Sequence, residues 1–315
     1  MFRQGSSSPL AALFVCILLS STAIAAPVSF EAAKSLARQQ VYHDRTQHGT
    51  FYCGCSWDWA GRSGGRVNLR SCGYEIRAQE NRAIRIEWEH VVPASLFGQQ
   101  RLCWQQGGRR NCKETDPIFN QMESDLHNLT PAIGEVNADR SNYRFGLLHE
   151  TPYQHGRCDF KVDFSERVAQ PREEIRGQIA RIYFYMHDRY DMRMSEQQQR
   201  LMMAWDAQFP PHEWERERNR RIARLMGHEN EFVSGNRRWT LGHRNTADGV
   251  RSSLPRANAP TPSPALPVLG NSRSKVYHLP TGCPSYGQIS ATNQVTFVSA
   301  DEAERAGYRL AGNCR

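Results

Sequence analysis

The cysteine residues restrict the folds open to this 315-residue chain more than any other feature. One of the nine, Cys16, lies in an apolar N-terminal segment, and the other eight are spread over the rest of the chain. An even set of cysteines in an exported chain is typical of a disulfide framework. Zinc binding is the alternative, but the single residue between Cys53 and Cys55 is fewer than the roughly two to four that separate paired zinc ligands. We therefore expect disulfides.

One of these disulfides can be assigned from local spacing. Cys103 and Cys112 bracket a short turn at Gly107-Gly108, which would bring the two sulfur atoms together. The connectivity of a second group of cysteines cannot be deduced, because several pairings are possible; this group consists of Cys53, Cys55, Cys72 and Cys158.

Residues 1–25 have the features of an export signal. Arg3 is their one charged residue, an apolar run covers 10–19, and small residues follow up to Ala25. This order is typical of a signal peptide, and the run is shorter than the roughly 20 residues that span a membrane. We predict cleavage after Ala25 and a periplasmic or secreted protein without a membrane anchor. Cleavage also removes Cys16 and leaves the even set.

The charge of the chain favours a polyanionic partner. The formal net charge of +8 falls to +7 when Arg3 is removed, and the pI is about 9.1. A basic protein attracts nucleic acid through its phosphates, although many exported proteins are basic for other reasons. Charge alone therefore does not identify a function.

A stretch rich in Pro, Ala and Ser divides the chain into domains. Residues 257–267 cannot form regular hydrogen bonds and are typical of a semi-extended linker. We assign a main domain to 26–245, the linker to 246–274, and a small cysteine-containing α/β module to 275–315. We expect the protein to be a monomer.

The main domain is predicted to be of the α+β class. Helices are expected over 29–42, 118–126, 131–140, 171–193 and 195–225, and loop-rich or irregular structure over 49–73 and 98–116. From Ile84 to Glu89, apolar and charged residues alternate, which indicates a strand that ends before Pro93. Thr130-Pro131 resembles an N-cap followed by proline at the first helical position.

Glu89-His90 is the first candidate for catalysis. A carboxylate is a ligand for hard metal ions, and an imidazole is a base that titrates near neutrality. A metal-dependent phosphodiesterase uses both, since the metal stabilises charge and the base deprotonates water. Neighbouring side chains of a regular strand point to opposite faces, however, so the two can share a site only where the strand ends or bulges. A surface Glu beside a packed His is the alternative.

The surrounding motifs resemble the endonuclease I family of periplasmic and secreted bacterial nucleases. The similarity covers about 30–230, and its motifs occur in order: EWEHVVPA from Glu87, FG from Phe97, CWQ from Cys103, GGR from Gly107, MESDLHNL from Met122 and GEVNADRSNY from Gly134. The resemblance implies a ββα-metal nuclease core of the His-Me finger type, in which a strand and a helix hold one divalent ion. It also implies a disulfide-stabilised fold with many helices.

The resemblance further implies roles for five residues. His90 is expected to be the general base, Glu89 and Asn137 the protein ligands of Mg²⁺, Arg109 the residue that holds the cleaved phosphate, and Glu123 a supporting acidic residue. Two oxygen ligands with water in the other positions suit Mg²⁺, and Mn²⁺ or Ca²⁺ would substitute in binding. The chemistry of a guanidinium alone would also allow Arg110 to hold the phosphate.

The C-terminal segment resembles a small module related to the metal-binding domain of the Ada DNA-repair protein. That domain uses four cysteines, whereas this chain has Cys283 and Cys314, with Gly287 and Ala311 where the other two would be. We therefore expect a disulfide between Cys283 and Cys314 in place of a zinc site. The C-terminal module itself has two possible functions, an additional DNA contact or a stabilising cap.

These expectations give a leading function and one alternative. The leading function is a non-specific endonuclease that cleaves DNA, and also RNA, through phosphate contacts and leaves 5′-phosphate ends. The alternative is a catalytically silent exported protein that binds nucleic acid. The intact set of Glu89, His90 and Asn137 favours the enzyme, because a silent binder has no use for it.

Overall fold

A computed structural model describes residues 26–253, 267–280, 283–286, 288–297 and 299–314. The expected export signal, 1–25, lies outside the described residues. The chain forms two compact units that divide between Val250 and Arg251. No helix among the described residues is long and apolar enough to cross a membrane.

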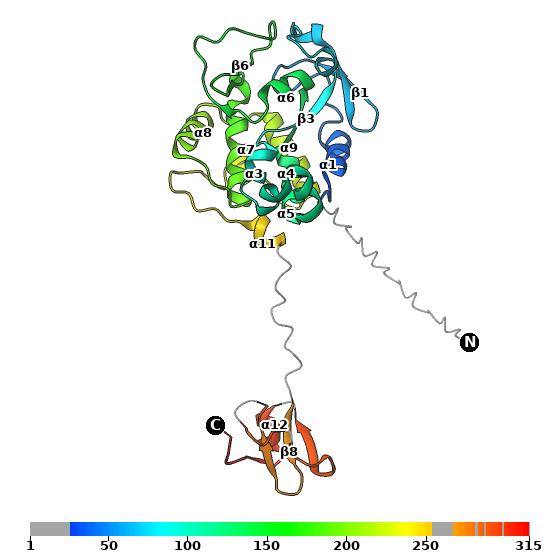
Figure 1. Cartoon of the computed structure of the whole chain (residues 1–315), viewed down its shortest axis with the longest axis vertical. Coiled ribbons are helices and arrows are strands. Elements are labelled where there is room, and N and C mark those ends of the chain that lie inside the picture. Colours follow the sequence, from blue (N-terminus) through cyan, green and yellow to red (C-terminus); the bar gives the residue numbers. More distant parts are fainter. Residues whose placement is uncertain (1–25, 254–266, 281–282, 287, 298, 315) are drawn as a thin grey trace, which may run out of the picture. The chain divides into compact units, whose positions relative to one another are not determined.

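Two antiparallel strands and a helix form the centre of the first unit. β3 (Ile86–His90) pairs with β4 (Leu129–Ile133), and α6 (Gly134–Arg140) begins directly after β4. Glu89 lies opposite Thr130 in this ladder, and His90 lies opposite Leu129. The unit combines many helices with small sheets, which confirms the α+β class and provides the expected strand–strand–helix arrangement (Figure 1).

The prediction of a helix from Pro131 was wrong. Pro131 lies in β4 opposite Trp88, and its carbonyl accepts a hydrogen bond from the Phe51 backbone N–H. In a strand, the N–H and C=O of one residue point to the same side, so the N–H that proline lacks would face Phe51 and not β3. No hydrogen bond between β3 and β4 is therefore lost at Pro131, and α6 starts three residues later, at Gly134.

The region 98–116, expected to be irregular, is largely helical. α3 (Ala94–Gly98) is followed by α4 (Leu102–Thr115), which is kinked where Gly107 and Gly108 leave helical geometry. Gly108 has a φ of +67°, a conformation that glycine adopts without strain. The Cys103–Cys112 disulfide spans the kink, which confirms the local pairing. α5 (Pro117–Glu123) follows, and α3, α4 and α5 pack against one another (Figure 1).

Helices also build the second half of the unit. Every residue of α7 (Arg176–Arg189) except Arg189 is buried, so this helix is surrounded by its neighbours. The predicted single helix over 195–225 is in fact two, α8 (Glu196–Gln208) and α9 (Glu213–Met226). Pro210-Pro211 separates them, because proline lacks the N–H that a helix interior needs and restricts the residue before it.

The region 49–73, expected to be a loop, contains a hairpin. β1 (Trp57–Ala60) pairs with β2 (Gly64–Val67), and two disulfides, Cys53–Cys158 and Cys55–Cys72, fix the region around it. The N-terminal helix expected over 29–42 is present as α1 (Phe30–Leu36), which continues as the π-helix η1 (Ala37–Val41). The remaining elements of this unit are η2 (Leu69–Cys72), α2 (Glu80–Ala83), η3 (Leu126–Asn128), β5 (Arg144–Phe145), β6 (Lys161–Asp163), β7 (Val168–Gln170), η4 (Glu173–Ile175) and α10 (Glu231–Ser234).

The second unit has its own sheet and apolar core. Its strands, in the order β10 (Gln294–Phe297), β8 (Val268–Asn271), β9 (Val276–His278) and β11 (Arg309–Leu310), pack with α12 (Ala300–Arg305); η5 (Ala291–Asn293) precedes β10. A Cys283–Cys314 disulfide is present, as expected. The sequence assigns 246–274 to a linker, but this range contains α11 (Asp248–Ser253) and β8. Regular secondary structure therefore occurs within the assigned linker, both before and after the Pro-rich stretch.

Candidate active site

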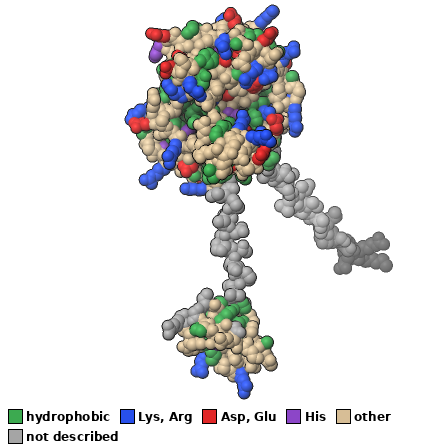
Figure 2. All heavy atoms as spheres, viewed as in Figure 1, with side chains coloured by type: hydrophobic (Ala, Val, Ile, Leu, Met, Phe, Trp, Pro, Cys, Tyr) green, Lys and Arg blue, Asp and Glu red, His purple; other side chains and the backbone are tan. Residues whose placement is uncertain are grey.

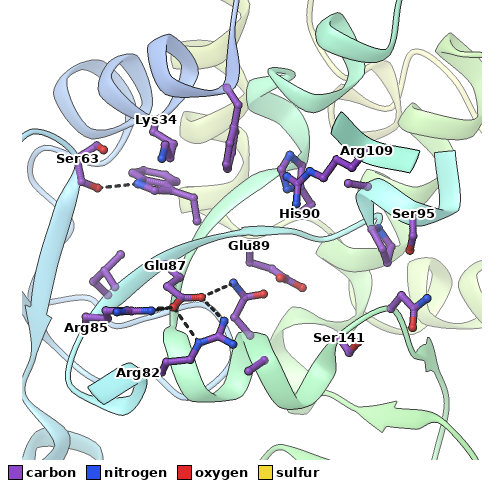
Figure 3. A pocket seen from close by; sticks show the side chains of 18 of the residues that line it. Lys34, Ser63, Arg82, Arg85, Glu87, Glu89, His90, Ser95, Arg109 and Ser141 are labelled. Atoms are coloured by element: carbon purple, nitrogen blue, oxygen red, sulfur yellow. Dashed lines mark hydrogen bonds and ion pairs between the residues drawn. The ribbon is translucent and has the colours of Figure 1, made fainter. Parts of the chain in front are cut away.

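A cleft of about 820 Å³ brings the expected site residues together. β3 contributes Glu89 and His90, and α4 contributes Arg109 (Figure 3). Asn137 comes from α6. Glu123, on α5, is buried behind the cleft and reaches it through its contacts with His90 and Arg109. All five residues therefore belong to one arrangement, although they come from four separate elements.

The end of β3 explains how Glu89 and His90 reach the same cleft. Strand alternation places Glu87 and Glu89 on one face, and His90 is the last residue of the strand. β3 ends there, and one further backbone hydrogen bond, from the Val91 N–H to the Asn128 carbonyl, follows it. At this strand end both side chains line the cleft, although neighbouring residues of a regular strand point to opposite faces.

The His90 ring is held in one orientation. Its Nε2 lies 2.8 Å from the backbone carbonyl oxygen of Glu123. A carbonyl only accepts, so Nε2 must carry the proton and Nδ1 must hold the free electron pair. Burial lowers the pKa of His90 to about 4, and Arg109 adds to this shift. The imidazole is therefore neutral at neutral pH and able to take a proton at Nδ1.

Arg109 is fixed by Glu123 at the edge of the cleft. Its Nε donates to Glu123 Oε1 at 2.7 Å, while 46% of its side chain stays exposed. Arg110, by contrast, is 90% exposed, pairs with Glu114 and does not line this cleft. Of the two arginines that the sequence left as candidates, Arg109 lines the cleft and Arg110 does not.

Glu89 is buried with incomplete charge compensation. Its Oε1 accepts a hydrogen bond from the Tyr52 hydroxyl at 2.7 Å and lies 3.5 Å from a nitrogen of Arg140. Burial nevertheless raises the pKa of Glu89 to about 7, against the lowering effects of Arg140 and Tyr52. Further positive charge near this carboxylate would stabilise its ionised form.

Asn137 is oriented by Glu87. The amide nitrogen of Asn137 donates to Glu87 Oε2 at 3.1 Å, and Arg82 and Arg85 hold the same carboxylate (Figure 3). Burial would raise the pKa of Glu87, but the hydrogen bonds from the two arginines outweigh it and lower the pKa. With its nitrogen committed to Glu87, Asn137 keeps its Oδ1 available for another partner.

Several contributors were not identified from the sequence. Phe30 lines the cleft and packs its ring 4.7 Å from that of His90, and Tyr52 and Arg140 support Glu89. Glu87 and Arg140 lie within the family motifs, so the motifs could have pointed to both as residues near the site. Phe30 and Tyr52 lie far from any such motif, and only the tertiary structure places them here.

Comparison with known proteins identifies the family of the chain. The family model described as Endonuclease I matches residues 29–236, which include every residue of the cleft. This chain belongs to the Endonuclease I family. It is therefore a nuclease. A second model, described as ArfC, matches residues 245–310.

Relatives from bacteria support the assignment to Endonuclease I. An "Extracellular deoxyribonuclease" from Aeromonas hydrophila is 51% identical over 234 residues, which are 74% of this chain and 98% of the relative. A "Periplasmic deoxyribonuclease" from the same organism is 54% identical over 58% of this chain and 77% of its own. An "Endonuclease-1" from Buchnera aphidicola is 50% identical over 59% of this chain and 73% of its own.

The residues of this Endonuclease I cleft fit a hard divalent cation. Among the described residues, none donates a hydrogen bond to Oε2 of Glu89 or to Oδ1 of Asn137, and both side chains line the cleft. Both donors are oxygens, which hard cations prefer. A cation between them would also supply the charge that the buried Glu89 lacks.

Proposed function

We propose that this protein is an exported, Mg²⁺-dependent endonuclease that hydrolyses phosphodiester bonds of DNA, and also of RNA, without sequence preference. The observation that carries the proposal is the neutral His90, whose free Nδ1 shares one cleft with Arg109 and with the oxygen donors Glu89 and Asn137. A base, a cation for phosphate and a pair of metal ligands are the parts that phosphodiester hydrolysis requires.

The chemistry follows from these positions. Nδ1 of His90 takes a proton from a water molecule, whose oxygen then forms a bond to phosphorus. The bond from phosphorus to the 3′ oxygen breaks, the electron pair stays on that oxygen, and the product carries a 5′-phosphate. Arg109 binds the phosphate oxygens and offsets their charge. Mg²⁺ held by Glu89 and Asn137 would stabilise the charge on the phosphate and on the departing oxygen.

The surface of the nuclease unit is consistent with binding that does not depend on base sequence. Lys and Arg side chains are spread over the visible face with Asp and Glu between them (Figure 2). Contacts with phosphate position a nucleic acid but do not read its bases. Export is supported by the extracellular and periplasmic relatives from Aeromonas hydrophila.

Incubation of the oxidised protein with supercoiled plasmid tests this function. We expect nicked, linear and then degraded DNA with Mg²⁺, and intact plasmid with EDTA. The product ends should accept labelled phosphate from a kinase only after phosphatase treatment, because they already carry 5′-phosphates. Binding without any cleavage in Mg²⁺ would instead support the catalytically silent alternative, and cleavage that is indifferent to EDTA would exclude the metal mechanism.

A further inference from the structure

A basic surface continues from the active-site cleft along the outer side of α4. A second hollow, of about 650 Å³, is lined by Arg109, Arg110, Lys113 and Glu114. Arg109 also lines the cleft, so the two hollows meet at this residue. We refer to Arg109, Arg110 and Lys113 as the α4 basic surface. The chemistry described above uses Arg109 and gives the other two cations no role.

The three cations lie side by side because of their spacing on the helix. Arg109 and Lys113 are four positions apart, and Arg110 and Lys113 are three apart. Both separations bring side chains together on one face of a helix. Cys112, the neighbour of Lys113, is fully buried, and its disulfide spans the kink of α4. The surface is therefore presented to solvent by a stretch of backbone that is held in place.

One carboxylate serves two of these cations. Glu123 Oε1 accepts a hydrogen bond from Arg109 Nε at 2.7 Å, and Glu123 Oε2 lies 3.9 Å from Lys113 Nζ. The Glu123 side chain is 1% exposed, whereas that of Lys113 is 49% exposed. A single negative charge cannot neutralise both cations, so positive charge remains on the solvent side of α4.

Arg110 is held only weakly by the protein. Its Nε donates to Glu114 Oε1 at 3.2 Å, and the two side chains are 90% and 61% exposed. An ion pair so exposed contributes little to stability, because water screens both charges. Among the described residues, no other accepts a hydrogen bond from the Arg110 side chain. The two terminal nitrogens of its guanidinium are therefore available to an external acceptor.

Arg82 and Arg85, which also line the cleft, differ from Arg110 in this respect. Each of them donates two hydrogen bonds to the carboxylate of Glu87. Their donors are thus committed inside the protein, to the carboxylate that orients Asn137. The donors of Arg110 are left for a partner from outside the chain.

We propose that the backbone of the nucleic-acid substrate crosses the α4 basic surface where it leaves the cleft. Arg110 and Lys113 bind phosphates adjacent to the one held by Arg109. This proposal rests on the proposed function, which supplies a polymer of phosphodiesters as substrate. A chain of phosphates fits a row of cations that begins in the cleft. Such contacts position a nucleic acid without reading its bases, in agreement with cleavage that has no sequence preference.

The salt dependence of DNA binding tests these contacts without cleavage. The oxidised mature chain in EDTA is titrated with a fluorescent duplex of mixed sequence at several salt concentrations. Each phosphate contact contributes about 0.9 to the slope of log affinity against log salt, because a bound cation displaces counterions. Arg110→Gln should therefore reduce the slope by about 0.9, and Arg110→Gln/Lys113→Gln should reduce it by about 1.8.

Two matched variants separate a phosphate contact from a general loss of charge. Arg200→Gln/Arg220→Gln removes the same charge from α8 and α9, where each arginine is more than half exposed and pairs with a glutamate of its own helix. Neither residue lines the cleft or the hollow on α4, so this variant should keep the wild-type slope. Arg110→Lys/Lys113→Arg keeps both charges and should keep the slope as well. Thermal unfolding checks that all variants are folded.

A reduced slope in the glutamine variants of α4 alone supports the proposal. Equal slopes in all proteins, or an equal reduction in Arg200→Gln/Arg220→Gln, would overturn it. Arg110→Gln leaves the contacts of Glu123 intact, so a reduced slope in this single variant excludes an indirect effect through Arg109. Plasmid cleavage in Mg²⁺ is measured separately. A wild type that binds DNA without cleaving it would refute the proposed catalysis and leave the salt result valid.

Discussion

His90 Nε2 donates a hydrogen bond to the backbone carbonyl of Glu123 at 2.8 Å, and the side chain of the same Glu123 accepts one from Arg109 Nε at 2.7 Å. One residue of α5 thus sets the orientation of the proposed base through its backbone and the position of the phosphate-binding arginine through its carboxylate. Since the two contacts use different atoms, substitutions of the Glu123 side chain can separate them.

Glu123→Gln should weaken phosphate binding without disturbing the base. The variant keeps the backbone carbonyl for His90 but replaces the charged acceptor for Arg109 with a neutral one. We expect kcat/KM to fall about ten-fold, as for loss of charge in one hydrogen bond, mainly through KM. Steady-state cleavage of a labelled oligonucleotide over a range of pH provides the measurement. A shifted acid limb of the pH profile with unchanged KM would contradict this division of roles.

His90→Ala should abolish cleavage while DNA binding in EDTA stays close to that of the wild type. Loss of a general base typically lowers a rate by about 10²- to 10⁴-fold. The comparison requires equal folding of both proteins, measured by thermal unfolding. Full activity in this variant would show that another group activates the water.

The apparent affinity for Mg²⁺ should depend on pH through Glu89. Burial raises the pKa of this carboxyl to about 7, so protons compete with the metal ion below that pH. Between pH 8 and pH 6 we expect the Mg²⁺ concentration for half-maximal binding to rise about ten-fold. His90, with a pKa of about 4, stays neutral over this range. Calorimetric titration at both pH values tests the prediction, and equal affinities would refute it.

The sequence predicted which residues gather around one cleft better than it predicted the path of the backbone. The motifs identified His90 and Glu89, whose chemistry depends on residue type and order. The helix predicted from Pro131 failed because the N–H that proline lacks would face Phe51, where no β3 hydrogen bond is lost. No local pattern contains that information, since it depends on which strand lies on which side.

The supporting residues show the same limit. Tyr52 reaches Glu89 across 37 positions, and Arg140 reaches it from the end of α6. Phe30 covers the His90 ring from a helix near the N-terminus. These contacts depend on tertiary packing, so neither periodicity nor spacing reveals them. The disulfide between Cys103 and Cys112 was predictable because its constraint is local.

Glu87→Gln should raise the Mg²⁺ requirement although Glu87 is not an expected ligand. Glu87 holds the amide nitrogen of Asn137, and its loss would allow the amide to turn its oxygen away from Glu89. Loss of such a supporting contact commonly weakens metal affinity by about 10- to 100-fold. Asn137→Ala should weaken it at least as much. Glu80→Gln, an exposed substitution nearby, is the control and should not change a Mg²⁺ titration of activity.

Removal of the Cys103–Cys112 disulfide should lower both stability and activity. The bridge closes a short loop, with a sequence separation of 9, around the kink that positions Arg109. Its loss in Cys103→Ser/Cys112→Ser should cost about 2–3 kcal/mol of unfolding free energy, because the unfolded chain gains freedom. Mobility at Gly107-Gly108 should also loosen Arg109 and raise KM. Denaturant unfolding and cleavage kinetics measure the two effects.

Cys283→Ser/Cys314→Ser, which opens the disulfide of the second unit, is the control and should leave cleavage unchanged. An equal loss of activity in both double variants would show that the kink has no special role in holding Arg109.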